Sequence, residues 1–468
     1  MSVLAGNPHA CVVWWRELER WINPNKVLRF DRVPPGWTIG RVGEVVRPIA
    51  ERVKVNPQDE YRMIGVKWYG QGTFHRETVN SNTTSASHLY RVVAGALIYN
   101  RLFAWKVSFA VVPQEHNGFF VSGEFPQFQV EASRLLPEYL YLFCITDRFI
   151  QAVNAASIGS AAVSRNRFKE EEFLGFPIAL PPLPVQRAIV RRWREAQAAI
   201  AQAKARADAL EAAIGREILK RLGIQAAEAD MLPKVFAVYW KDLERWSVDY
   251  LRRDLASGRQ LAQVKYPLVA LGDIAKVSYG LQKCPGNRPG AHARPYLAVA
   301  NVQAGRLDLD KIKYIEVPDS EMEAFRLKAG DLLVCEGNSA DLVGRPAIWN
   351  DEIPDCVHQN HILKVRMIGD AALPHYVLEY MHTSPARNYF RSRAKQTTNL
   401  ASLNSNDLRG LPLPLPPLNV QRGIVEMVAQ KRAEVARERQ AAAKLSAEVV
   451  KEVEEMILGT RPVKGAIA

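Results

Sequence analysis

The 468-residue sequence predicts an α+β protein in which two globular domains are each followed by a long α-helix. The first observation is a repeat: residues 180–190 (LPPLPVQRAIV) return as residues 415–425 (LPPLNVQRGIV), so that Gln186 corresponds to Gln421, 235 positions later. The second is that a long segment rich in Ala and charged residues follows each copy, with apolar residues at helical spacing. The third is that short apolar runs bounded by turn residues precede each copy, a pattern typical of strands.

The repeat extends beyond these two segments, which indicates an internal duplication. Residues 15–21 (WRELERW) match residues 240–246 (WKDLERW), and three further matches follow in the same order: 43–45 with 272–274, Tyr61 and Gly70 with Tyr296 and Gly305, and 95–98 with 330–333. The predicted organisation is therefore a domain at 1–182, a helix at 183–222, a linker at 223–235, a second domain at 236–416, a second helix at 417–459 and a tail at 460–468.

Inside the domains, the apolar runs predict corresponding strands and helices. Strands are expected at residues 94–99, 109–113 and 119–122, with counterparts at 331–335, 346–349 and 361–365. Short helices are expected at residues 137–154 and 374–395. Each domain is therefore predicted to be α+β.

Each long helix is predicted to begin at paired prolines and to end at a Leu-Gly pair. In the first, apolar residues alternate at steps of four and three, which is the seam of a coiled coil; they are Ile189, Trp193, Ala196, Ile200, Ala203, Ala207, Leu210 and Ile214. The second seam is less regular, because Lys431 and Glu438 occupy two of its positions. Helices of this length with one narrow stripe each need a similar partner, so we expect them to pair. The alternative is two amphipathic helices packed on separate domains.

Composition favours a nucleic-acid partner. Lys and Arg outnumber Asp and Glu by 62 to 49, giving a net charge of +13, and a basic protein is attracted to acidic polymers. Five scattered cysteines without CxxC spacing argue against a disulfide framework. The chain opens without a secretory signal pattern, and no apolar run reaches the ~18 residues of a membrane-spanning helix. We therefore expect a cytoplasmic protein without a membrane segment.

The sequence lacks four common catalytic signatures. It has no GxxxxGK[ST] loop, no GxGxxG after a strand, no Asn-Pro-Pro-aromatic motif of amino-methyltransferases, and no acidic-x-Lys pair of metal-dependent nucleases. His358 and His361 stand near Cys356, but zinc sites usually show a second pair of ligands at suitable spacing. We predict no catalytic residue, cofactor or metal in this chain, and interpret it as a reader and not an enzyme.

Polar and aromatic loops are the candidate DNA contacts, because amide and guanidinium groups read base edges while aromatic and Lys side chains support stacking and the backbone. In the first domain they are Lys67, Trp68, Tyr69, Asn100, Arg101, Trp105, Lys106, Arg165 and Arg167. In the second they are Asn301, Gln303, Asn338, His358, Gln359, Asn360, Lys395, Thr398 and Asn399. The alternative for each residue is a turn that caps backbone groups. Corresponding loops are polar but chemically different, which is what reading two different half-sites requires.

Several of these stretches resemble one known family, the specificity subunits of Type I restriction-modification enzymes. The resemblance is carried by 67–70 (KWYG), 99–105 (YNRLFAW), 121–126 (VSGEFP), 335–338 (CEGN), 359–361 (QNH) and both Pro-Pro-Leu-x-x-Gln-Arg elements. With the two-fold repeat, it covers nearly the whole chain.

This resemblance implies two target-recognition domains that read a split, asymmetric sequence in double-stranded DNA, with the two helices pairing antiparallel to fix the spacing. It implies that modification subunits, two in number, dock on the helices and that a restriction subunit joins them for phage defence. S-adenosylmethionine, ATP and Mg would belong to those partners. The candidate partner contacts of this chain are Gln186, Arg187, Gln421 and Arg422.

Two other classes of function remain open at this stage. The chain could be a stand-alone nuclease or methyltransferase with an unfamiliar site, which incubation of the chain alone with DNA, Mg²⁺ and S-adenosylmethionine would reveal. It could also be a coiled-coil bridging protein without sequence preference, which competition by random DNA would reveal.

Overall fold

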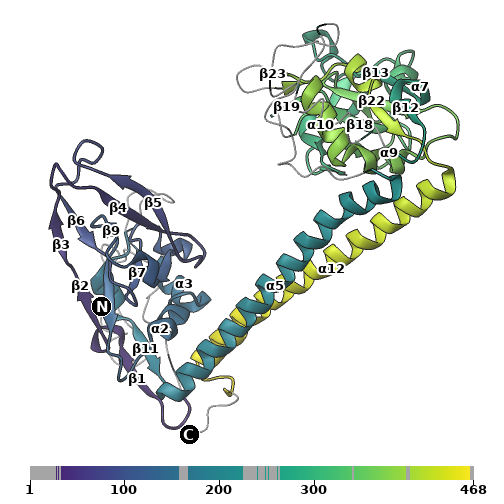
Figure 1. The fold of residues 1–468 in the computed structure, drawn as a ribbon. Coiled ribbons are helices and arrows are strands. Elements are labelled where there is room, and N and C mark those ends of the chain that lie inside the picture. Colours follow the sequence, from purple (N-terminus) through teal and green to yellow (C-terminus); the bar gives the residue numbers. More distant parts are fainter. Residues whose placement is uncertain are drawn as a thin grey trace, which may run out of the picture. The chain divides into compact units, whose positions relative to one another are not determined.

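The computed structural model describes residues 28, 30, 33–157, 167–224, 240, 248, 251, 261, 264–339, 342–396 and 401–463 (Figure 1). The chain divides into two compact units, residues 1–203 with 441–468 and residues 204–440. Each unit contains one globular domain and one half of each long helix. The Trp-containing repeat at 15–21 and 240–246 lies outside the described residues, apart from Trp240.

In the first unit, the first and last strands of the domain pair with each other next to the first long helix. Strand β1 (Thr38–Arg41) pairs antiparallel with β11 (Pro177–Leu180), which immediately precedes that helix. Among the described residues, one sheet has the order β2 (Val46–Ile49), β10 (Gln127–Val130), β7 (Leu97–Tyr99) and β8 (Phe109–Val111). Another has the order β3 (Arg52–Lys54), β6 (His88–Arg91), β9 (Phe120–Val121), β4 (Tyr61–Val66) and β5 (Thr73–Val79).

Aromatic side chains fill the core between the first of these sheets and the helices. The Tyr99 ring centroid lies 5.0 Å from that of Phe109 and 5.6 Å from that of Phe173. Helices α2 (Pro137–Cys144), α3 (Asp147–Ala156) and α4 (Glu170–Gly175) add further buried aromatics to this cluster. The predicted helix 137–154 is thus two helices, because Thr146 caps α3 by accepting a hydrogen bond from the Phe149 N–H at 3.3 Å.

The second unit repeats the topology of the first. Strand β12 (Leu268–Ala270) pairs antiparallel with β25 (Pro412–Pro414), as β1 pairs with β11. A sheet of the described residues has the order β13 (Ala275–Tyr279), β22 (Ile362–Met367), β18 (Leu332–Cys335) and β20 (Pro346–Ile348). These four strands occupy the places of β2, β10, β7 and β8. The internal duplication expected from the sequence is therefore present in the fold.

The remaining strands of the second unit differ from those of the first. They form three smaller sheets in the described residues, with the orders β17–β14–β21, β15–β16 and β19–β24–β23. Their bounds are Lys313–Glu316, Ala293–Leu297, Val357–His358, Val302–Gln303, Arg306–Leu307, Gly337–Asn338, Ala401–Ser402 and Lys395–Gln396. The predicted helix 374–395 is again two helices, α9 (Pro374–Met381) and α10 (Ser384–Arg393). The shared sheet is a common frame that carries different loops.

The two long helices pair antiparallel within each unit. They are α5 (Leu183–Leu222) and α12 (Leu418–Ile457), each 40 residues long, and each is followed by a glycine with a left-handed φ of +72°. In the first unit the beginning of α5 packs against the end of α12, through Ile200 and Val449 among others. In the second unit the end of α5 packs against the beginning of α12, through Ile214 and Val428 among others. The predicted pairing is confirmed.

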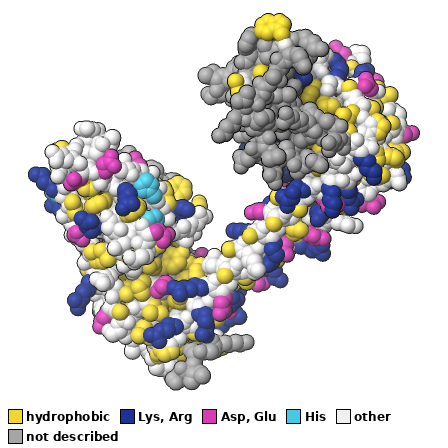
Figure 2. Space-filling model, viewed as in Figure 1, with side chains coloured by type: hydrophobic (Ala, Val, Ile, Leu, Met, Phe, Trp, Pro, Cys, Tyr) yellow, Lys and Arg dark blue, Asp and Glu magenta, His cyan; other side chains and the backbone are white. Residues whose placement is uncertain are grey.

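Ion pairs accompany the apolar seam. Glu438, one of the two charged seam positions, accepts hydrogen bonds from Arg206 Nε at 3.1 Å and Nη2 at 2.9 Å. Arg192 pairs with Glu452 at 2.6 Å in the same way. Lys and Arg side chains lie among Asp and Glu along the exposed sides of the helices (Figure 2). Among the described helices, none has both the length and the apolar character that crossing a bilayer requires.

Candidate nucleic-acid interface

In the first unit, two of the predicted loops lie side by side. The turn at residues 67–72 connects β4 to β5, and the loop at residues 100–106 ends in the short 3-10 helix η3 (Ala104–Lys106). The Tyr69 N–H donates to the Lys106 carbonyl at 2.8 Å, and the Gly70 N–H donates to the Val107 carbonyl at 2.9 Å. Residues more than thirty positions apart in the sequence thereby form one surface.

A cation and three aromatic rings make up the centre of this surface. The Lys106 ammonium lies 3.6 Å from the centroid of the Trp68 ring and 5.0 Å from that of Trp105. The Trp68 ring in turn packs against Phe103, with 5.3 Å between centroids. A cation held over an aromatic face keeps its charge and is fixed in position. The surface therefore presents a placed positive charge together with flat apolar area.

The backbone of both loops is strained at the contact. Tyr69 has φ +57° and Val107 has φ +59°, a left-handed conformation that non-glycine residues adopt at a cost of roughly 1–3 kcal/mol each. The Tyr141 hydroxyl donates to the Gly70 carbonyl at 2.7 Å, and burial raises the pKa of Tyr141 to about 12, so this donor keeps its proton. These contacts keep Trp68 and Tyr69 at the protein surface, where 41% and 68% of their accessible areas are exposed to solvent.

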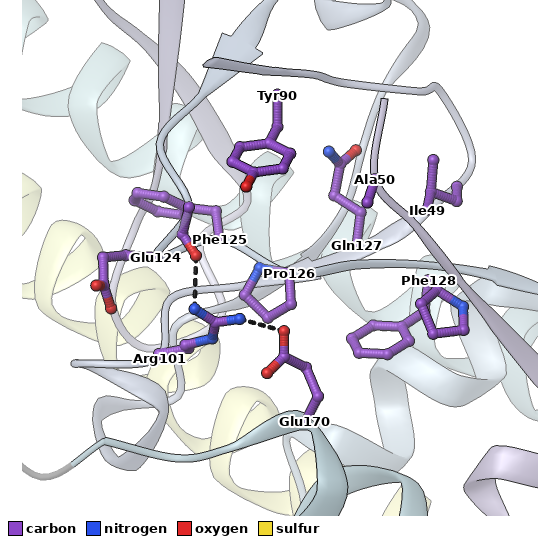
Figure 3. A pocket seen from close by; sticks show the side chains of 12 residues that line it. Ile49, Ala50, Tyr90, Arg101, Glu124, Phe125, Pro126, Gln127, Phe128 and Glu170 are labelled. Carbon is purple, nitrogen blue, oxygen red and sulfur yellow. Dashed lines mark hydrogen bonds and ion pairs between the residues drawn. The ribbon is translucent and has the colours of Figure 1, made fainter. Parts of the chain in front are cut away.

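The predicted role of Arg101 as a base reader needs correction. Its guanidinium donates to the Gly123 carbonyl at 2.7 Å and forms an ion pair with Glu170, at one side of a pocket of about 390 Å³ (Figure 3). The guanidinium is therefore used inside the domain. Arg167 pairs with Glu124 at 2.5 Å but stays 59% exposed, which leaves it accessible to a phosphate. Arg165 lies outside the described residues.

Asn100 and Trp105 shape the loop that they belong to. The Asn100 side-chain oxygen accepts a hydrogen bond from the Leu102 N–H at 2.9 Å, and the Trp105 indole donates to the Leu102 carbonyl at 3.1 Å. Both side chains remain partly exposed. The Trp105 ring also contacts the Lys106 ammonium, at 5.0 Å from the ring centroid, so this loop adjoins the surface formed by Lys67, Trp68, Tyr69 and Lys106.

In the second unit, three of the predicted loops come together. Strand β24 pairs with both β19 and β23, so that Gly337 and Lys395 both lie opposite Ser402. The Glu336 N–H donates to the His361 carbonyl at 3.0 Å, and the Glu336 carboxylate lies 2.7 Å from His361 Nδ1. The segments 336–338, 359–361 and 395–396 thus share one face. Gln359 and Asn360 are partly exposed there, and Lys395 is exposed.

Two predicted DNA contacts of the second unit are buried, and this corrects the prediction. His358 has no exposed surface, and burial lowers its pKa to about 3. Asn301 is 7% exposed; its amide accepts from the Ala298 N–H at 2.8 Å and donates to the carbonyls of Asp308 and Lys311. The Asn301 side chain stabilises its loop from within, and the His358 ring is buried away from any DNA surface. The amino-acid sequence of a loop that contains Asn or His looks the same whether that side chain faces solvent or hydrogen-bonds the backbone.

Four further residues were predicted as DNA contacts in this unit: Gln303, Asn338, Thr398 and Asn399. Gln303 lies in the β15–β16 hairpin, and its amide donates to the Ala300 carbonyl at 2.7 Å. The Asn338 side chain, Thr398 and Asn399 fall outside the described residues.

The sequence suggested that the two glutamines of the repeated motif contact partner subunits at the surface. The structure instead buries both of them, and each acts as an internal clamp by making three hydrogen bonds to the backbone. Gln186 has no exposed surface; its side chain accepts from the Leu136 N–H at 2.9 Å and donates to the carbonyls of Arg134 and Pro181, both at 2.8 Å. Gln421 makes the equivalent three bonds in the second unit. Each clamp fixes a long helix to its own domain. The neighbouring Arg187 and Arg422 are exposed and remain candidates for a partner contact.

Comparison with known proteins bears on the origin of this arrangement. No protein-family model matches the chain. The EcoKI specificity subunit of Escherichia coli, a type I restriction enzyme subunit, is 25% identical over 279 residues, which is 59% of this chain and 55% of that protein. The type I MjaX specificity subunit of Methanocaldococcus jannaschii is 27% identical over 136 residues, which is 29% of this chain and 32% of that protein.

The chain is similar in sequence to these two Type I restriction specificity subunits. It spans about half or less of the length of these two curated relatives. A solved structure is similar to this chain, with a TM-score of 0.58 and 20% sequence identity. That structure concerns complex assembly and conformational transition of a type I restriction-modification system, and the alignment covers 93% of this chain and 100% of the solved chain. That likeness shows that the two chains share a fold over almost the whole length of this chain.

Some supporting residues of the interface were not among the sequence candidates. Glu124 and Glu170 neutralise two arginines of the first unit, Tyr141 supports the 67–72 turn, and Glu336 pairs with His361 in the second. Each lies far along the chain from the group that it contacts, except for the 25 positions between Glu336 and His361. No local pattern connects these pairs, although the polar stretches 335–338 and 359–361 contain Glu336 and His361.

Proposed function

We propose that this chain is a non-catalytic, sequence-specific DNA-binding subunit of a Type I restriction-modification complex. Its two domains would each read one half of a split, asymmetric site. The observation that carries this proposal is the repeated sheet topology with different loop surfaces: an aromatic and Lys-rich surface in the first unit, and an amide, His and Lys surface in the second. Two copies of one frame with different chemistry suit two different half-sites.

The paired helices support a second part of the proposal, a scaffold for other subunits. Each helix provides 40 residues, roughly 60 Å at 1.5 Å per residue, and much of its surface is charged and exposed. We propose that modification subunits dock there, with Arg187 and Arg422 at equivalent places, and that a restriction subunit joins the complex. The S-adenosylmethionine, ATP and Mg that methylation and cleavage need would be held by those partners.

The test is sequence-specific binding by the chain purified with its modification subunit. Lys67→Ala in the first unit and Asn360→Ala in the second should each weaken binding by roughly 1–3 kcal/mol, the size of one good base contact. The loss from Lys67→Ala should disappear when the first half-site is scrambled, and the loss from Asn360→Ala when the second is scrambled. Lys54→Ala, an exposed lysine on the edge strand β3 at the opposite side of the sheet from the β4–β5 turn, is the matched control. Equal affinity of the wild type for all duplexes of one length would refute the proposal.

A further inference from the structure

Tyr69 combines an exposed side chain with a backbone that hydrogen bonds hold in place. It lies in the turn between β4 and β5 with 68% of its surface exposed. Within the part of the chain that the structure describes, its ring makes no ring stacking contact, ion pair or side-chain hydrogen bond, whereas the neighbouring Trp68 ring is covered by the Lys106 ammonium at 3.6 Å. Tyr69 is thus the aromatic residue of this surface whose ring is free to contact a ligand.

The backbone that carries this ring is tied on two sides. The Tyr69 N–H donates to Lys106, the Gly70 N–H donates to Val107, and the Gly70 carbonyl accepts from Tyr141. The left-handed φ of +57° at Tyr69 is a conformation that a glycine would adopt without strain, yet a tyrosine occupies the position. A large side chain kept at a strained, exposed and well-anchored place is expected to have a use there.

The charges around the ring indicate what it would contact. Lys67 is exposed next to it in the turn, and the Lys106 ammonium lies on the adjoining Trp68 ring. A free aromatic face beside the fixed Lys106 ammonium matches a nucleic-acid base and its neighbouring phosphate. Bases of a duplex already stack on each other, so a protein ring gains a base face only where a base step is opened.

We infer that Tyr69 acts as a wedge: its ring stacks on a base within the half-site of the first domain and opens the base step there. The duplex is thereby distorted locally at that step. Lys106 neutralises a phosphate beside the opened step. Pyrimidine–purine steps unstack most easily, so the half-site contains such a step at the wedge. This inference rests on the proposed function, because it assumes that the first domain binds DNA.

The experiment uses the full chain with its modification subunit and duplexes of the mapped target in which 2-aminopurine replaces each purine of the first half-site in turn. The fluorescence of 2-aminopurine rises when its stacking is lost. We expect a several-fold rise on binding at a purine of the opened step, which loses its neighbouring base; a rise at a base that the modification subunit extrudes for methylation is counted separately, because it does not depend on Tyr69. Tyr69→Phe should keep the rise, because the ring and not the hydroxyl is needed.

Tyr69→Gly is the decisive variant. It removes the ring and relieves the strained φ, so the first unit should unfold at an unchanged or higher temperature. The fluorescence rise should disappear, and the affinity for the target should fall by roughly 5- to 150-fold, the range expected for one lost base–aromatic stack. Tyr314→Ala, which removes a 56% exposed tyrosine of the second unit, should leave the signal from the first half-site unchanged.

The outcomes separate this inference from the function on which it rests. Specific binding without a fluorescence rise at any position, or a rise that persists in Tyr69→Gly, would overturn the wedge and leave the DNA-reading function standing. Failure of the wild-type complex to prefer its target would overturn both.

Discussion

At the scale of single residues, Gln186 and Gln421 show how the repeated motif performs one task twice. Each side chain satisfies one backbone N–H and two carbonyls in a place without solvent. Buried backbone groups without partners are destabilising, and an amide offers both donors and an acceptor in one group. The glutamine therefore defines where a domain ends and its long helix begins.

Gln186→Ala should consequently destabilise the first unit. The change leaves the Leu136 N–H and the carbonyls of Arg134 and Pro181 without their partner, and we expect a loss of roughly 2–4 kcal/mol in the free energy of unfolding. Urea denaturation, with hydrogen exchange to locate the affected unit, measures it. Arg187→Ala, an exposed neighbour, should change stability by less than about 0.5 kcal/mol. Similar values for the two variants would contradict the clamp.

Buried His358 predicts an acid-sensitive second unit. The folded chain keeps this ring neutral down to a pKa of about 3, while the unfolded chain binds a proton near 6.5. Since the unfolded state then holds more protons, stability is full above pH 6.5 and falls as the pH decreases through that window, by about 2 kcal/mol at pH 5. His382, with a pKa lowered to about 4 by burial, acts in the same direction.

The measurement is the urea midpoint of the second unit between pH 7 and pH 4.5. His358→Gln cannot titrate there, so its stability should depend less steeply on pH than that of the wild type. The same slope in both proteins would show that the ring does not carry this linkage.

At the scale of elements, small residues set how closely the two long helices approach. Ala442 and Ala203 are 3% and 6% exposed and belong to the same buried cluster of the first unit. Ala442→Leu forces extra volume into this contact, and we expect a loss of about 1–3 kcal/mol in the stability of that unit. Ala441→Leu, one position earlier on the exposed side, is the matched control. Equal thermal midpoints for the two variants would mean that the seam is not tightly packed.

The sequence predicted these elements better than it predicted the interface, for a physical reason. Helix pairing follows from a local periodicity, and the bounds of α5 follow from Pro182 and Gly223 at its ends. Four predicted strands lie in the repeated sheet as β7, β8, β18 and β20 and are shorter than expected: β7 begins at Leu97 because Gly95 turns the chain with φ +78°. The predicted correspondence of 119–122 with 361–365 is wrong, because β9 lies in the other sheet and β10 takes the place of β22.

The orientation of a polar loop side chain depends on distant groups. Asn301 faces the carbonyls of Asp308 and Lys311, and Arg101 meets Glu170, which lies 69 positions away. No local pattern distinguishes such a residue from Lys67, which faces solvent. Sequence could therefore identify the loops that form the candidate interface, but not which of their side chains are available to a ligand.

At the scale of the whole molecule, the length of the paired helices is expected to determine the gap between the two half-sites. The boundary between the units crosses α5 between Ala203 and Lys204 and α12 between Gln440 and Ala441. Inserting seven residues at both places adds two turns to each helix and preserves the seam. The added length is roughly 10 Å, equal to about three base pairs at ~3.4 Å each.

Methylation mapping of DNA from cells that carry the wild-type chain or this lengthened chain, with the partner subunits, measures the gap between the half-sites. We expect a modified site of two defined parts separated by an undefined spacer, with the spacer about three base pairs longer for the lengthened chain and both parts unchanged. A single continuous site, or the same spacer for both chains, would show that the paired helices do not set this gap.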